Sequence, residues 1–140
     1  MGRTFGALDA ALAQVVPARL ERREQLAGII RACVRFVAAN PHFVRLMNDE
    51  CKRDSARMRW LVDHHGRRLY ETGVALLKHG IRRGWLPDVP APHAYYAFIG
   101  AVGMMFSQAP ECRRLTGTDP TTSHAAVEAH AEAVVRLFLR

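Results

Sequence analysis

A stretch without Asp, Glu, Lys or Arg, from Ala91 to Gln108 (APHAYYAFIGAVGMMFSQ), sets the strictest limit on the fold. From Ala94 to Phe106, only two tyrosine hydroxyls interrupt its apolar character. These 13 residues are fewer than the roughly 20 that span a bilayer. We therefore expect a buried helix here and no membrane span, with Pro92 in its first turn and Pro110 stopping it.

Wound as a helix, this segment carries two different stripes. One is built of large side chains, namely Tyr95, Ile99, Val102 and Phe106. The other is nearly smooth and consists of Ala97, Gly100, Ala101 and Gly103. A helix that is apolar on every side needs partners on every side. We expect the large stripe to face the chain's own core and the small one to meet another helix, supplied in part by a second subunit.

Apolar residues elsewhere recur at three- and four-residue steps, and no alternation typical of a strand is found. This spacing predicts helices over residues 4–16, 18–39, 41–54, 55–83, 91–108 and 122–139. Gly66 could kink or break the fourth, Gly84 should cap its end, and residues 109–120 should form the longest loop. The predicted fold is all-α, a helical bundle of about six helices in a single domain over residues 1–140.

The charge of the chain is basic but mixed. The formal net charge is +7, and Arg alternates with Asp or Glu in ERRE (21–24) and NDECKRD (48–54). Such a balance permits anionic partners without demonstrating them. No aromatic-interleaved basic motif or zinc-finger spacing accompanies it, so we interpret these charges as a solvated, partly ion-paired surface.

The cysteines and the N-terminus indicate the compartment. Cys33, Cys51 and Cys112 are odd in number and widely spaced, which is not the pattern of a disulfide framework. Residues 1–17 mix Arg3 and Asp9 into an amphipathic pattern unlike a signal peptide. We therefore expect a cytoplasmic protein.

The order of these signals resembles the C-terminal, ligand-sensing and dimerisation domain of TetR-family transcriptional regulators. Residues 39–46 (ANPHFVRL) resemble the NP-x-F-x-R-L junction between the family's fifth and sixth helices, and Glu50 follows where many members carry an acidic residue. Residues 76–86 (LLKHGIRRGWL) resemble the end of its seventh helix, and residues 89–103 its eighth. The family's helix-turn-helix head has no counterpart in these residues, so operator DNA should be bound only through an absent N-terminal domain.

This resemblance implies an apolar cavity inside each subunit that binds a small hydrophobic effector. For any single wall residue, simple core packing is the alternative interpretation. Aromatic and thioether side chains suit a cavity that tolerates several ligand shapes. The predicted ligand-binding residues are Phe36, Met47, Trp60, His64, Tyr70, Tyr95, Phe98, Ile99, Val102 and Met105, with Cys33 and Val37 as further candidates.

Metal-dependent and nucleophilic chemistry find little support. His64 and His65 are adjacent and diverge by 100° on a helix, and His124 with Glu128 would be half a site. The serines lack a nucleophile-elbow context, and no glycine-rich phosphate loop is present. We expect no catalytic residues, no metal and no cofactor, and hence no enzyme.

The sequence therefore predicts the effector-binding and dimerisation domain of a TetR-like transcriptional regulator, such as a repressor. The small hydrophobic or aromatic effector would control DNA binding by the missing head. We expect a homodimer through residues 91–108 and 122–139, because Ala126, Ala129 and Ala133 continue the small-residue stripe. The alternative is a helical homodimerisation or interaction module with a filled core and no ligand; a helical-bundle enzyme or metalloprotein is the third hypothesis.

Overall fold

The computed structural model describes residues 2–140 and shows an all-helical chain without a strand in that range. The fold class is the predicted one. Each of the six expected segments is helical, although the fourth is divided by a π-helical turn. The elements are α1 (Gly2–Val15), α2 (Arg23–Ala39), α3 (Pro41–Cys51), α4 (Ala56–Leu61), the π-turn η1 (Val62–Gly66), α5 (Arg67–Arg82), α6 (Ala91–Ser107), α7 (Ala109–Thr116) and α8 (His124–Phe138).

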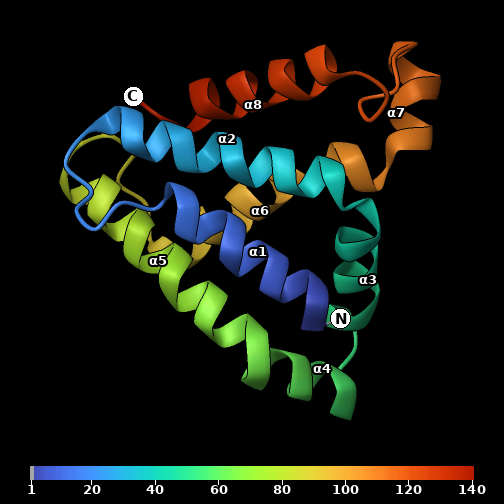
Figure 1. Cartoon of the computed structure of the whole chain (residues 1–140), viewed down its shortest axis with the longest axis horizontal. Coiled ribbons are helices and arrows are strands. Elements are labelled where there is room, and N and C mark those ends of the chain that lie inside the picture. Colours follow the sequence, from blue (N-terminus) through green and yellow to red (C-terminus); the bar gives the residue numbers. More distant parts are fainter. Residues whose placement is uncertain (1) are drawn as a thin grey trace.

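The most centrally placed helix is α2, which contacts α1, α3, α5, α6 and α8. Figure 1 shows α2 running between α8 and α1, with α6 behind them and α5 passing diagonally below. Helices α3 and α4 close the end opposite the C-terminus. One face of α6 remains uncovered within the single chain, where we expected a second subunit to supply part of the cover.

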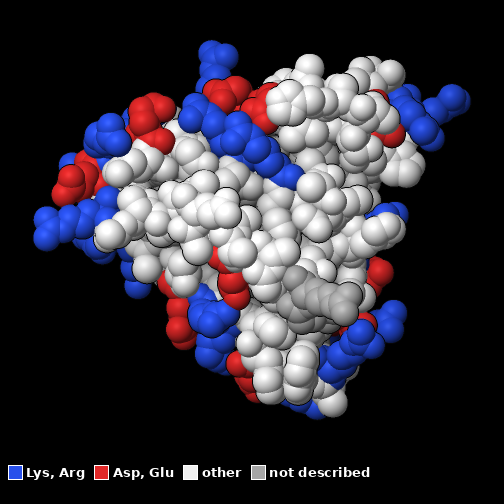
Figure 2. Space-filling model, in the orientation of Figure 1, with Lys and Arg blue, Asp and Glu red and all other residues white. Residues whose placement is uncertain are grey.

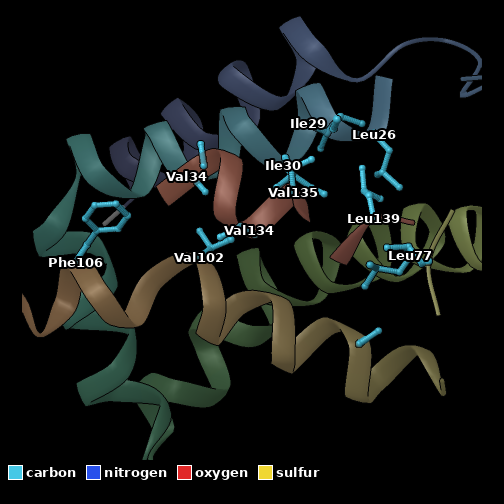
Figure 3. Packing of buried hydrophobic residues seen from close by; sticks show 14 residues of the cluster. Leu26, Ile29, Ile30, Val34, Leu77, Val102, Phe106, Val134, Val135 and Leu139 are labelled. Atoms are coloured by element: carbon cyan, nitrogen blue, oxygen red, sulfur yellow. The ribbon is translucent and has the colours of Figure 1, made fainter. Parts of the chain in front are cut away.

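The main hydrophobic core lies where α2, α6 and α8 meet. Ile30 and Val34 of α2, Val102 of α6 and Val134 of α8 are almost fully buried. Figure 3 shows these side chains pointing toward one another between the three helices. Each such residue stabilises the fold by about 1.5–3 kcal/mol relative to an exposed side chain. The core therefore fixes the position of α6 against α2 and α8.

Two boundaries differ from the sequence prediction. Helix α2 begins at Arg23 rather than near residue 18, because the Gln25 side-chain oxygen accepts hydrogen bonds from the backbone N–H groups of Glu21 and Arg22. The segment predicted as the longest loop contains α7. Pro110 ends α6 as expected, but it also lies in the first turn of α7, where a missing N–H costs nothing.

The long fourth segment is neither broken nor simply kinked at Gly66. Its helix continues through η1, where the backbone takes a wider π-helical turn, and then runs on as α5. Gly84 closes α5 as predicted, with a left-handed φ of 76°. The N–H of Gly84 donates to Ile81 O and that of Trp85 to Gly80 O, which is the pattern of a Schellman cap.

Charged side chains gather at the rim of the molecule. Figure 2 shows a band of Lys and Arg atoms over α2 beside Asp and Glu atoms of α8, and a largely uncharged middle. Among residues 2–140, no helix is both long and apolar enough to cross a membrane.

Candidate functional site

A cavity of about 230 Å³ lies between α1, α2, α3, α5 and α6, with Phe138 of α8 at its edge. Its volume is below the roughly 300–1,000 Å³ usual for small-molecule sites. Almost all of its wall is aliphatic or aromatic. In the described part of the wall, the side chains with polar atoms are those of Cys33, Asn48, Thr72 and Tyr95, and none of them carries a charge at neutral pH.

The structure brings together in this wall six of the ten residues predicted to bind a ligand. They come from three helices, so the cavity is assembled by tertiary packing. The six are Phe36 of α2, Met47 of α3, and Tyr95, Phe98, Ile99 and Val102 of α6. Cys33 and Val37, the two further candidates, also line it.

The other four predicted residues lie elsewhere. Trp60 is 49% exposed and stacks on the ring of His64 at 4.3 Å, outside the cavity. Both belong to the α4–η1 segment, which contacts α3 and α5 but does not reach the cavity wall. Tyr70 supports the cavity indirectly, since its ring meets that of Tyr95 edge-on at 4.8 Å. Met105 lies one turn beyond Val102, past the end of the cavity, and is exposed.

Helix α1 supplies a part of the wall that the sequence prediction did not include. Leu8 and Leu12, one turn apart, close the cavity on that side. Their apolar spacing was recognisable, but nothing in the sequence places the first helix over α2 and α5. At the start of α1, Phe5 stacks on His65 at 4.5 Å and meets Phe43 edge-on at 5.1 Å. Neither His64 nor His65 lines the cavity.

The ring of Tyr95 packs closely against α5 in the wall of the cavity. A Cβ atom on Gly73 of α5 would lie 2.9 Å from its ring, so the absence of a side chain at position 73 lets the ring lie against α5. Burial, together with the neighbouring Tyr96 and Tyr70 hydroxyls, raises the pKa of Tyr95 to about 12. The hydroxyl is therefore neutral at pH 7 and can donate or accept a hydrogen bond.

Cys33 is partly buried, and it lines the cavity from α2. Burial raises the pKa of its thiol to about 12, so the thiolate that would act as a nucleophile is not formed at neutral pH. In the part of the chain that the structure describes, no three His, Cys, Asp or Glu side chains are grouped as a metal site would require.

Helices α6 and α8 lie side by side and share an uncovered face. The ring of His130 is 2.8 Å from Ala101 O, and Phe98 meets Phe138 edge-on. On the outer side, Tyr96 is 69% exposed, Met104 59% and Leu137 77%. The small residues Ala97, Gly100, Ala129 and Ala133 are exposed as well. Gly103 instead is buried, and a Cβ added there would lie 3.4 Å from Cγ1 of Val44 in α3.

Charged pairs hold α8 to α2. Arg35 donates to both carboxylate oxygens of Glu128 at 2.7 and 2.9 Å. Arg31 donates to Glu132 at 2.6 Å, with a longer second contact of 3.4 Å. These hydrogen bonds lower the pKa of both carboxyls. The pairs therefore fix α8 against the helix that forms one wall of the cavity.

Comparison with known proteins agrees with this architecture. A search of curated proteins found no match. The sequence profile of the family described as "Tetracyclin repressor-like, C-terminal domain" matches residues 23–137. The match covers α2 to α8 almost completely and leaves out α1. The chain thus belongs to the tetracyclin repressor-like C-terminal domain family, whose members are regulatory domains of transcriptional regulators.

Proposed function

We propose that this domain binds a small hydrophobic or aromatic effector in the cavity and forms a homodimer through α6 and α8. The effector would control DNA binding by a helix-turn-helix head that lies outside these 140 residues. The observation that carries this proposal is the cavity of about 230 Å³, because an interaction module with a filled core would have none. Nothing in the proposal requires catalysis.

The proposed effector-binding residues are those that the wall contains. Phe98 and Val102 of α6 line the cavity together with Phe36 of α2 and Met47 of α3. Tyr95 and Ile99 complete the α6 side. A ligand bound against this wall would gain affinity from burial of its apolar surface, at roughly 25 cal/mol per Å² removed from water. An effector can shift a conformational equilibrium only if it binds one state more tightly than the other.

The test of sensing is a thermal-shift screen of a chemically diverse compound library against the wild type and a filled-cavity variant. Val102→Trp should abolish every stabilising shift. Because Val102 also packs in the main core, Met47→Trp on the opposite wall provides a second filled variant. Leu115→Trp, on the exposed surface of α7, is the control and should respond as the wild type does. The proposal would be contradicted if no compound raised the melting temperature of the wild type. It would also be contradicted if every such thermal shift persisted in the filled variants.

The dimer is proposed on the uncovered face of α6 and α8. Exposed apolar residues run along both helices, and small residues between them allow close helix approach. An obligate interface of this kind should bury on the order of 2,000 Å² or more. Light scattering should give a dimer at micromolar concentration. Ala133→Glu in the face should yield monomers, whereas Ala75→Glu on the exposed side of α5 should not. A monomeric wild type would refute this interface.

A further inference from the structure

Among the described residues that line the cavity, none carries a charge that could neutralise an ionised ligand. Three arginines of the surrounding helices pair with carboxylates outside the cavity: Arg31 and Arg35 pair with Glu132 and Glu128 of α8, and Arg68 of α5 pairs with Asp9 of α1. None of these residues lines the cavity. Burying an ionised group without a counter-charge or a set of hydrogen bonds is strongly unfavourable.

The polar groups that do line the cavity are few and neutral. Asn48 and Thr72 are exposed residues, so they mark places where the cavity reaches the surface. Cys33 and Tyr95 lie deeper, and their protonated forms persist well above neutral pH. No described residue forms a hydrogen bond with the Tyr95 hydroxyl, and its oxygen is not a fully buried atom, so a ligand can bond it.

We propose that the cavity selects an uncharged molecule of about two fused aromatic rings, carrying one hydroxyl or carbonyl group that bonds Tyr95. This inference rests on the proposed function and narrows its ligand class by excluding organic acids and amines. The size follows from volume: an apolar cavity of about 150 Å³ accepts benzene, and this one is 230 Å³.

The test compares naphthalene, 2-naphthol and 2-naphthoate at pH 7.5 by isothermal titration calorimetry. We expect 2-naphthol to bind most tightly and 2-naphthoate not to bind at the concentrations that saturate with 2-naphthol. Tyr95→Phe should weaken 2-naphthol binding about 3–10-fold, the effect of one net hydrogen bond, and leave naphthalene unchanged. Met47→Trp should abolish binding of both.

The outcomes separate this inference from the proposed function. If 2-naphthoate binds as tightly as 2-naphthol, and Met47→Trp abolishes binding of both, the cavity is a ligand site. The proposed selectivity for uncharged molecules would then be wrong. If neither neutral compound binds, the inference is overturned, while the library screen still decides whether the cavity binds any effector. An unchanged affinity in Tyr95→Phe would overturn the role of that hydroxyl.

A separate observation concerns the route into the cavity. A crevice of about 190 Å³ lies between α1 and α5 and shares Leu12, Leu69 and Thr72 with the cavity wall. Asp9 of α1 and Arg68 of α5 line this crevice and form an ion pair across it. The Arg68 side chain is 72% exposed and that of Asp9 46%, and solvent-accessible pairs of this kind are weak and break readily. We infer that the crevice is the passage to the cavity and that the Asp9–Arg68 pair closes it.

The other places where the cavity nears the surface serve this purpose less well. Ile99 lines the cavity and is 44% exposed, but it lies on the α6 face that the proposed dimer would cover. Asn48 lies on α3, beside the packing of Val44 against Gly103. The crevice lies between α1 and α5, which are not the helices of the proposed dimer face, so the dimer would not cover it.

Cys33 provides a reporter of this passage that needs no ligand. In a Cys51→Ser, Cys112→Ser background, Cys33 reacts slowly with N-ethylmaleimide because burial raises the pKa of its thiol. At one fixed pH this slowing is the same in every variant, so the ratio of their rates measures how often a small neutral molecule reaches the cavity. Asp9→Asn should speed the addition by up to about fivefold, the effect of losing one exposed pair. Ala13→Trp, which fills the crevice without lining the cavity, should slow it. Gln14→Trp and Asp54→Asn are the matched controls and should change nothing.

Urea distinguishes this route from global unfolding. If N-ethylmaleimide reaches Cys33 through the crevice, the rate of addition should not change at low urea concentrations. If it reacts only with unfolded molecules, the logarithm of the rate should rise with urea in proportion to the surface exposed on unfolding. Rates that are equal in wild type, Asp9→Asn and Ala13→Trp would overturn the inference, and so would a steep urea dependence from the lowest concentrations.

Discussion

Replacing Gly73 with alanine should transmit a change in α5 directly into the cavity. The new Cβ would lie 2.9 Å from Cε2 of Tyr95, closer than Cβ atoms approach other atoms in proteins, and 3.1 Å from Cδ2. The ring must therefore move by about 0.5 Å to restore an ordinary contact distance. Because Gly73 and Tyr95 both line the cavity, we expect the displaced ring to occupy part of its volume.

Two opposing effects set the size of the change in stability. Alanine in a helix interior is favoured over glycine by about 1 kcal/mol, whereas overpacking costs about 1–3 kcal/mol. Gly28 provides the matched control, because it lies inside α2 and a Cβ there would meet nothing within 4 Å. Gly28→Ala should therefore stabilise the protein by about 1 kcal/mol. The two variants should differ by about 1–3 kcal/mol, with Gly73→Ala the less stable.

Urea unfolding followed by circular dichroism, at one fixed protein concentration, measures this difference. The concentration must be fixed because dimerisation shifts apparent stability. Gly73→Ala should also weaken 2-naphthol binding, whereas Gly28→Ala should not. Equal stabilisation by both substitutions would refute the argument that the Tyr95 ring fills the space beside position 73.

The remaining predictions concern the contacts that hold the helices in place. Arg35 and Arg31 lower the pKa of Glu128 and Glu132 from the ordinary 4.5, so these pairs stabilise the fold above about pH 4.5 and are lost as the pH falls through the lower folded-state values. The urea midpoint should thus fall more steeply below pH 4.5 in the wild type than in a Glu128→Gln, Glu132→Gln double variant; parallel profiles would contradict this. Gly84→Ala should cost about 1–2 kcal/mol in urea unfolding, because φ at this position is left-handed, and Gly6→Ala, in open space on α1, serves as its control.

Much of the fold can be predicted from local patterns in the sequence. The apolar spacing located the helices because amphipathic periodicity reports which face is buried. The same reasoning missed α7, since a proline after a helix was interpreted only as a stop. Pro110 in fact ends one helix and begins the next, and Gly117 then closes α7 with a φ of 78°. Local rules of this kind predict that a helix is interrupted, but they do not distinguish a loop from a new helix beyond the interruption.

The cavity was harder to predict because its walls come from five helices. On α6, periodicity placed Tyr95, Phe98, Ile99 and Val102 correctly on one side. On the α4–α5 segment, periodicity did not place the side chains correctly, because the wider π-turn η1 changes the direction in which residues after it point relative to those before it. Trp60 and His64 lie before and within that turn, and they stack on each other outside the cavity.

Ligand and partner meet on α6, and this gives the proposed sensor a physical route for coupling. Phe98 and Val102 face the cavity, Tyr96 and Met104 lie on the uncovered face, and Ile99 belongs to both. A helix moves as a rigid unit, so a ligand that displaces Ile99 also moves the face presented to a second subunit. By linkage, the coupling is reciprocal: if dimerisation changes the affinity for the ligand, the ligand must change the dissociation constant of the dimer to a matching extent. We expect sedimentation equilibrium with and without saturating 2-naphthol to give different dimer dissociation constants. Identical dissociation constants would mean that α6 does not couple the ligand to the dimer. The effect of the ligand would then have to be transmitted by another helix of the cavity wall, and α1 is the one at the N-terminus.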